Sequence, residues 1–115
     1  MEDHGFWLEG FPAAVTVTDA EGKILYMNAR SRETFAKDGG GALVGRSVFD
    51  CHPEPALSKT RRLYEDRIPN DYTIRKAGRK KIVHQAPWYR NGVFAGVVEI
   101  TFPIPDDLPH FERDS

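Results

Sequence analysis

A chain of 115 residues has room for one domain with a single modest hydrophobic core, which excludes a second independently folded unit. Sixteen basic residues against seventeen acidic ones leave a formal net charge of −1, so no overall charge draws the molecule to nucleic acid or to an anionic membrane. The single cysteine, Cys51, excludes an intramolecular disulfide and cannot form a zinc site by itself. With no signal-peptide pattern and no apolar stretch long enough to span a bilayer, the sequence favours a cytoplasmic protein.

The N-terminal half predicts a cap, a hairpin and a helix. Residues 6–12 hold three aromatic side chains ahead of a proline and indicate a short helical or irregular cap. Residues 14–18 and 23–27 are rich in β-branched and apolar side chains on either side of a turn, which is typical of a β-hairpin. Asn28 is a good N-cap for a helix that starts at Ala29, and the three glycines at 39–41 end that helix.

The C-terminal half predicts one longer helix and a three-stranded meander. The helix covers residues 56–67, after two prolines that a first helical turn tolerates. Strands follow at 71–76, 80–89 and 93–102, with Asn91-Gly92 as a strong hairpin signal and two prolines ending the sheet. Two strands, a helical middle and three strands predict an α+β fold, a five-stranded antiparallel sheet with the helical segment packed on one face. We divide the chain into an N-terminal cap (1–12), one domain (13–103) and an acidic, loosely ordered tail (104–115).

Four short motifs in this order resemble the PAS family. Residues 19–29 place an acidic turn with glycine before an apolar strand that ends in Asn-Ala, and Phe35 is similar to the aromatic of the next helix. Residues 43–47 resemble the family's element of two apolar residues, Gly, a basic residue and Ser, and residues 91–101 resemble its closing hairpin. The resemblance spans residues 11–102. It implies a non-catalytic sensor that binds a small molecule between sheet and helices and signals through dimer or partner contacts.

The chain departs from the family pattern after Glu99-Ile100-Thr101. Many PAS domains continue from this element into a helix that passes a signal to an attached effector. Here Pro103 and Pro105 follow, and prolines at this spacing forbid a helix. The sequence therefore does not favour a helical lever to an attached effector. The chain is either a stand-alone sensor module or a fragment of a larger protein, and a protein effector is a further expected partner.

The resemblance places a ligand cavity between the sheet and the helical middle. Ten side chains are candidates for its walls: Phe35, Val48, Phe49, His52, Leu57, Tyr72, Ile74, His84, Trp88 and Val98. The alternative is that these side chains simply fill the core and that the chain is a ligand-free interaction module. For His84 the sequence leaves two orientations open, inward toward a ligand or outward at a dimer face.

Haem is a lesser alternative for the ligand. His52 lies in the region from which haem-binding PAS proteins take their axial histidine, although the chain has no Cys-x-x-Cys-His motif. A flavin adduct is not predicted, because Cys51 falls several residues later than the cysteine of light-sensing relatives. No paired carboxylates, metal-ligand spacing or catalytic triad stand out, so we expect no metal site besides haem and no enzymatic activity.

The last predicted strand is apolar on both faces. Strict alternation puts Phe94, Val98, Ile100 and Phe102 on one face and Val93, Ala95 and Val97 on the other. The helical middle can cover only one of these faces, so the sequence predicts a homodimer in which N-terminal caps and sheet faces pack together. The candidates for this contact are Phe6, Trp7, Leu8, Phe11, Val93 and Val97. The alternative is a monomer whose own N-terminal segment covers the face.

Overall fold

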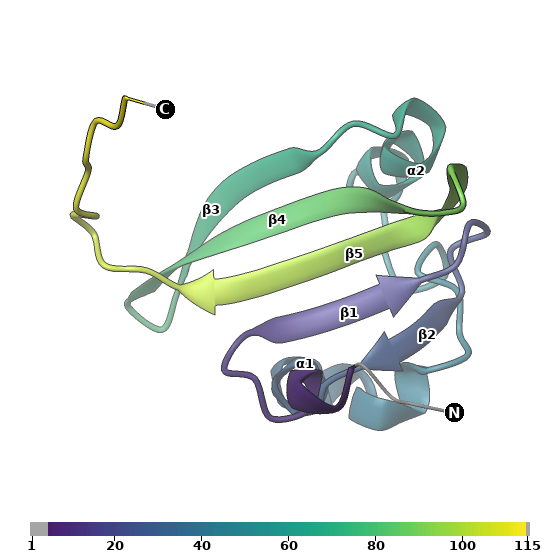
Figure 1. Cartoon of the computed structure of the whole chain (residues 1–115). Coiled ribbons are helices and arrows are strands. Elements are labelled where there is room, and N and C mark those ends of the chain that lie inside the picture. Colours follow the sequence, from purple (N-terminus) through teal and green to yellow (C-terminus); the bar gives the residue numbers. More distant parts are fainter. Residues whose placement is uncertain (1–4, 115) are drawn as a thin grey trace.

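A computed structural model describes residues 5–114 of the chain. Its centre is a five-stranded antiparallel sheet with the strand order β2-β1-β5-β4-β3 (Figure 1). The strands are β1 (Ala14–Thr18), β2 (Ile24–Met27), β3 (Asn70–Lys76), β4 (Arg79–Arg90) and β5 (Val93–Pro103). The N-terminal hairpin pairs with the C-terminal meander through β1 and β5, which join the two ends of the domain. The predicted α+β architecture is confirmed.

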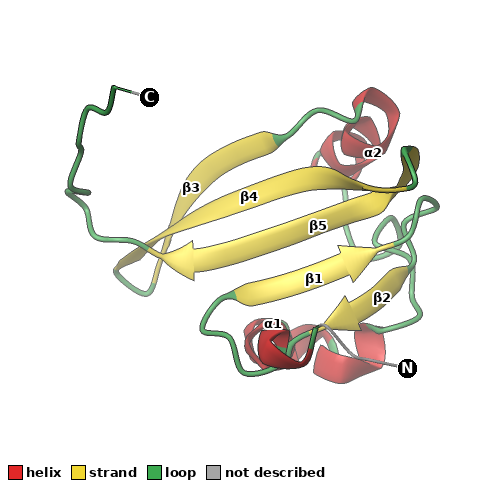
Figure 2. Ribbon diagram, in the orientation of Figure 1, coloured by secondary structure: helices red, strands yellow, loops and turns green. Residues whose placement is uncertain are grey.

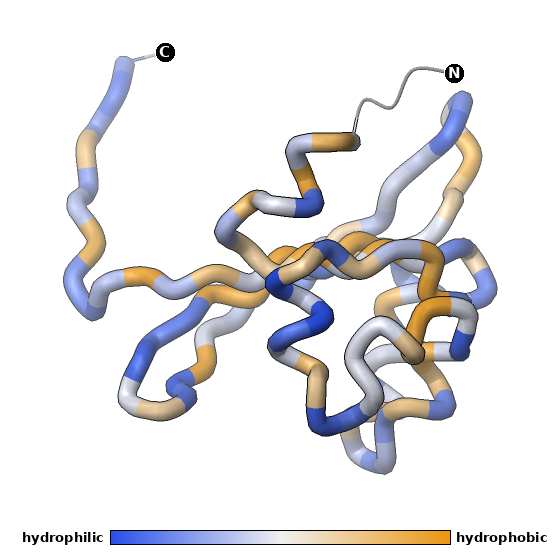
Figure 3. The backbone as a smooth tube through the Cα atoms, turned by 90° about the horizontal axis from the view of Figure 1, so that it is seen from below, coloured by the Kyte–Doolittle hydropathy of each residue, from blue (hydrophilic) through white to orange (hydrophobic). Residues whose placement is uncertain are grey.

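The helices lie between β2 and β3 in the sequence and gather toward one side of the sheet (Figure 2). They are α1 (Ala29–Thr34), the 3₁₀ turns η2 (Ala36–Asp38) and η3 (Gly40–Leu43), and α2 (Ala56–Asp66). A further 3₁₀ turn, η1 (Phe6–Leu8), precedes β1. Figure 3 views the sheet along its edge, with the N-terminal segment on one side and the helical middle on the other. We call the sheet face toward the helical middle the inner face and the opposite one the outer face.

Local sequence signals explain most of these boundaries. The Asn28 side chain accepts a hydrogen bond from the Ser31 backbone and thereby caps α1, as its position in the sequence predicts. The turn between β4 and β5 holds Asn91 and Gly92 at φ values of +52° and +79°, the conformation that Asn-Gly favours. Within residues 5–114, no helix is long and apolar enough to cross a membrane.

One extra residue in β5 changes the register of the longest hairpin. Trp88 pairs with Gly96, but the next residue, Tyr89, pairs with Phe94, so Ala95 has no partner. Such a bulge reverses the alternation of side chains along the bulged strand. Strict alternation is therefore wrong for Phe94, which lies on the inner face against the Tyr64 ring, with ring centroids 6.3 Å apart.

The tightly packed core is small and lies at the β2 end of the inner face. Ile24, Met27 and Leu43 are buried there, and Phe35, Val48 and Cys51 pack against them. Beyond β5, residues 104–114 form no helix or strand and are largely exposed. A hydrogen bond from Ile104 to Lys80 and an ion pair between Arg75 and Asp106 hold the beginning of this segment. The remaining inner face, over β1, β5 and β4, is not filled by this core.

Candidate functional site

A cavity of about 460 Å³ lies between the inner face and the helical middle. Its volume falls in the range of small-molecule sites, and most of its wall is apolar, as is usual for such sites. The apolar part comes from β2, β5, α2 and the segment between β2 and α2, and it includes Ile24, Met27, Phe35, Leu43, Val48, Leu63, Tyr64 and Val97. Arg46 and Asp38 are exposed residues that also line it. We call this space the main cavity.

A second hollow adjoins the main cavity beside α2. It lies against β3 and β4, and Lys59, Arg62 and Tyr72 contribute to its wall. The two spaces have five lining residues in common: His52, Thr60, Leu63, Gln85 and Glu99. We call the second space the side hollow. Because these residues border both spaces, a ligand in the main cavity that contacts them also lies next to the side hollow.

A row of polar side chains crosses the floor of both spaces. In the sheet register Thr16 pairs with Glu99, Glu99 with Gln85, and Gln85 with Asn70. The Gln85 amide donates to Glu99 Oε2 at 2.7 Å, and the Asn70 amide donates to Gln85 Oε1 at 2.9 Å. The sheet therefore presents hydrogen-bonding groups to a space whose other walls are largely apolar.

Tyr64 holds α2 against the sheet. Its hydroxyl forms a 2.5 Å hydrogen bond with the Thr18 hydroxyl, and its ring packs edge-to-face on Phe49 and Phe94. Burial raises the pKa of Tyr64, and the hydrogen bond with Thr18 partly opposes this rise. The hydroxyl consequently stays protonated at neutral pH and fixes the far wall of the main cavity.

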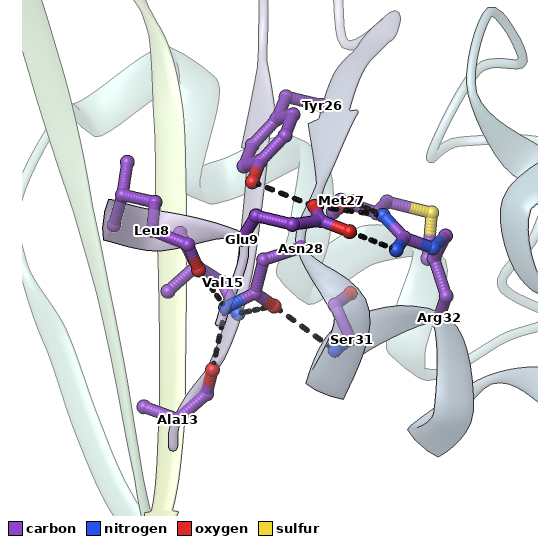
Figure 4. A network of polar contacts seen from close by, with 9 residues as sticks. All are labelled: Leu8, Glu9, Ala13, Val15, Tyr26, Met27, Asn28, Ser31 and Arg32. Carbon is purple, nitrogen blue, oxygen red and sulfur yellow. Dashed lines mark hydrogen bonds and ion pairs between the residues drawn. The ribbon is translucent and has the colours of Figure 1, made fainter. Parts of the chain in front are cut away.

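A second polar network connects the cavity wall to the N-terminal segment (Figure 4). The side chain of Asn28 is 0% exposed, accepts from the backbone of Val15 and Ser31, and donates to the carbonyls of Leu8 and Ala13. The Ser31 hydroxyl in turn lies 2.6 Å from the hydroxyl of Thr16, which lines the main cavity. A continuous chain of contacts thus runs from the cavity to the N-terminal segment.

An ion pair fixes the same segment from its other side. Arg32 on α1 binds the Glu9 carboxylate, which also accepts a hydrogen bond from the Tyr26 hydroxyl (Figure 4). Hydrogen bonding to Arg32 holds the pKa of Glu9 below its usual value. Since both side chains are in contact with solvent, Arg32 at 37% and Glu9 at 50% exposure, this pair orients the segment more than it stabilises the fold.

Four of the ten predicted wall residues line one of the two spaces. Phe35, Val48 and His52 line the main cavity, and Tyr72 and His52 line the side hollow. Three others line neither: Phe49, which packs on Tyr64 instead, Leu57 and Ile74.

The last three predicted wall residues lie on the outer face, so their assignment to the cavity is wrong. His84 and Val98 alternate with Gln85 and Glu99, whose side chains line the cavity, and they therefore point away from it. Of the two orientations that the sequence left open for His84, the structure shows the outward one. On the outer face His84 pairs with Asp71, its directly opposite residue on the neighbouring strand β3. Trp88 is also an outer-face residue, and its indole nitrogen donates to the Thr18 carbonyl at 2.9 Å.

The predicted contact face needs one correction as well. Val97 does not belong to it, because this side chain is buried and lines the main cavity. Phe6, Trp7 and Phe11 are exposed, and the rings of Trp7 and Phe11 pack edge-to-face with centroids 5.5 Å apart. Val93 is 67% exposed in the last hairpin. Leu8 is half-buried, and its backbone carbonyl accepts a hydrogen bond from the Asn28 side chain (Figure 4).

The polar floor of the cavity was not predicted from the sequence. Glu99 is the only charged residue in β5, whose other residues are almost all apolar. A lone carboxylate in such a strand is a signal that it faces something other than bulk solvent. The hairpin turn at Asn91-Gly92 alone would have placed Gln85 opposite Val98, and only the bulge brings it opposite Glu99. Among residues 5–114, no three His, Cys, Asp or Glu side chains gather in a way that could hold a metal ion.

Comparisons with known proteins agree on the fold. A family model described as PAS fold matches residues 8–70. A C-terminal domain from Streptococcus mutans superimposes with a TM-score of 0.71 at 23% identity, covering 86% of this chain and 81% of that one. The PAS domain of the histidine kinase ThkA gives 0.61 at 17% identity, with 80% of this chain and 99% of that one covered. The Aer2 receptor from Vibrio cholerae, described as a dual PAS-heme oxygen sensor, gives 0.62 at 20% identity, with 85% and 99% covered. No curated protein sequence matches the chain.

Proposed function

The chain belongs to the PAS family, and we propose that it is a sensor module that binds a small molecule in the main cavity and passes the binding event to a second copy of itself. The observation that carries the proposal is a space of about 460 Å³ that combines apolar walls with a hydrogen-bonded polar floor. A side-chain-filled core, as a ligand-free interaction module would have, leaves no such space. PAS domains are generally sensory modules, and we assign this chain no catalytic step and a cytoplasmic place of action.

The signal would travel through the two polar networks around α1. A ligand that displaces Thr16 alters its contact with Ser31, and Ser31 is held by the same Asn28 side chain that fixes the carbonyl of Leu8. A buried amide with four partners has few alternative arrangements, so it transmits a displacement instead of absorbing it. Binding would then shift the N-terminal segment relative to the outer face.

This shift would change the contact with a second copy of the chain. The outer face carries Phe102, which is exposed, together with the half-buried Val98 and Ile100. The N-terminal segment lies on the same side of the sheet (Figure 3), and its Phe6 is 75% and its Trp7 53% exposed. Exposed apolar groups of this kind usually mark a contact surface. A second copy of the chain can cover this surface with its own identical surface, which gives a symmetric dimer. In a sedimentation experiment, we expect the unsubstituted chain to behave as a dimer and the Trp7→Glu variant to behave as a monomer. A monomeric unsubstituted chain at micromolar concentration would contradict this part of the proposal.

Occupancy of the cavity is tested by mass spectrometry of the purified chain under native and denaturing conditions. We expect an extra mass that is lost on denaturation, together with a visible absorption band only if the haem alternative at His52 holds.

Two neighbouring residues of β5 provide a matched pair of variants. Val97 lines the cavity, whereas Val98 points to the outer face. Val97→Phe should fill part of the space and abolish the extra mass, and Val98→Phe should retain it. If the chain never carries a ligand, and a library of small molecules leaves its melting temperature unchanged, the ligand-free alternative replaces the sensor proposal.

A further inference from the structure

We propose that the main cavity selects ligands with an apolar body and a positively charged head, such as an alkyl- or arylammonium ion, and that Glu99 binds the head. The inference rests on the proposed function, because it names the chemical class of the ligand for the same cavity. It is carried by the position of Glu99 in the polar floor, by its one free carboxylate oxygen, and by the lack of any cation paired with it among residues 5–114.

Glu99 is held in a defined orientation by its neighbours. Asn70 donates to the oxygen of the Gln85 amide, so Gln85 must turn its NH₂ group toward Glu99, and this group donates to Oε2 at 2.7 Å. The other carboxylate oxygen, Oε1, forms no hydrogen bond with residues 5–114. No buried polar side-chain atom in this part of the chain lacks a partner, so Oε1 is accessible, and Glu99 lines the main cavity and the side hollow. One acceptor is thus presented to a ligand at a fixed place.

No cation from the described part of the chain neutralises this carboxylate. The ion pairs among the described residues involve Glu9, Glu33, Asp71, Asp106 and Glu112, and none involves Glu99. The basic residues Arg46, Lys59 and Arg62 also line the two spaces, but they are exposed and can keep their charges in water. A carboxylate that is only partly solvated and unpaired attracts a cation more strongly than one on the open surface.

The negative charge of Glu99 acts on both sides of the site. Burial first, and then the charge of Glu99, raise the pKa of Tyr72 in the side hollow. Burial raises the pKa of Tyr64, the hydrogen bond with Thr18 opposes this rise, and the charges of Asp19 and then Glu99 add to it. Both effects agree with an acidic floor that would repel an anionic ligand.

The remaining walls define the rest of the ligand. Next to Glu99 on β5, Val97 continues the floor as an apolar surface, and Ile24, Met27 and Leu43 lie in the wall toward β2. An ammonium group would donate to Oε1 as a charge-assisted hydrogen bond, and its hydrocarbon part would lie against these side chains. A neutral alcohol has no positive charge to attract Glu99, and the negative charge of Glu99 would repel a ligand with a carboxylate head.

Three probes with one chain length separate these cases: octylammonium, octanol and octanoate, titrated into the full chain by calorimetry. Octanol can also donate a hydrogen bond to Glu99, but only the ammonium adds the attraction between full opposite charges. We therefore expect octylammonium to bind about tenfold more tightly than octanol, a difference of about 1.4 kcal/mol, and octanoate to bind more weakly than either. Glu99→Gln should remove the advantage of octylammonium over octanol. Glu21→Gln, which removes the same charge from an exposed turn, should leave it intact.

The outcomes distinguish this inference from the proposed function. If all three probes bind alike, and Val97→Phe blocks them, the cavity is a ligand site but the preference for cations is wrong. If octylammonium does not bind, or binds Val97→Phe as well as the unsubstituted chain, the preference for cations is wrong. The proposed function then still stands or falls on the extra mass and the small-molecule library. The comparison of the three head groups on the unsubstituted chain needs no variant, so it remains decisive even if circular dichroism shows that Glu99→Gln does not fold.

Discussion

Replacing Gly96 by alanine should destabilise the fold far more than the same replacement at glycines that have open space around them. Gly96 lies at the bulge of β5 with φ at +147°, a conformation that side-chain-bearing residues rarely adopt. A Cβ atom built there would lie 2.0 Å from the carbonyl oxygen of Thr18 and 2.8 Å from the carbonyl carbon of Asp19. Both atoms belong to the backbone, so no side-chain rotation can relieve the contact.

The magnitude follows from three effects. The unfavourable backbone conformation costs about 1–3 kcal/mol, and forcing extra atoms into a packed region costs about 1–3 kcal/mol more. Moving the end of β1 away from Gly96 would also break the hydrogen bond from Trp88 to the Thr18 carbonyl, which is worth about 1 kcal/mol. We therefore expect a loss of at least about 3 kcal/mol, a large share of the ~5–15 kcal/mol that stabilises a typical domain.

Two other glycines separate the contributions. Gly45 also has a positive φ, +94°, but a Cβ atom at that position would have no other atom within 4 Å, and Gly10 has open space without the unusual φ. Urea unfolding followed by tryptophan fluorescence should give a loss near 0 for Gly10→Ala and about 1–2 kcal/mol for Gly45→Ala. If Gly96→Ala costs no more than Gly45→Ala, the close approach of β1 to β5 at Gly96 is incorrect.

Three further substitutions test the networks and one turn. Asn28→Asp keeps the acceptor oxygen but sets a second carboxylate oxygen against two backbone carbonyls, so we expect a loss above about 2 kcal/mol in chemical denaturation. Tyr64→Phe removes the hydrogen bond to Thr18 and should cost about 1 kcal/mol at pH 7. Because the folded-state pKa of Tyr64 is raised, its contribution is complete below the unfolded pKa of about 10 and disappears as the pH rises through the folded value. The melting temperatures of the two proteins should therefore approach each other as the pH rises above about 10, and a constant difference would argue against a buried hydroxyl. Ala77 has φ at +52° in the turn before Gly78, so Ala77→Asn should raise the urea midpoint by the equivalent of about 0.5–1 kcal/mol, and an unchanged midpoint would contradict that turn geometry.

Local chemistry accounts for the elements that could be predicted. Asn28 is a preferred N-cap residue, and Asn91-Gly92 suits a two-residue turn, and both effects act within a few residues. The order of strands and helices, and the motifs that resemble the PAS family, follow from such short-range signals. The predicted cavity position between sheet and helices is consistent with the space observed there, and Phe35, Val48 and His52 do line it.

The sequence by itself determined which segments become strands and helices, the order in which they occur, and the family to which the chain belongs. Only the tertiary structure decided which side of the sheet each residue of β4 and β5 faces. The physical reason is that facing alternates with every residue, so the single unpaired Ala95 reverses it for the rest of the hairpin. That one bulge turns Val97 and Glu99 toward the cavity and Val98 away from it. Beside the bulge, Gly96 lies too close to the Thr18 carbonyl for any side chain, a contact between residues far apart in the sequence.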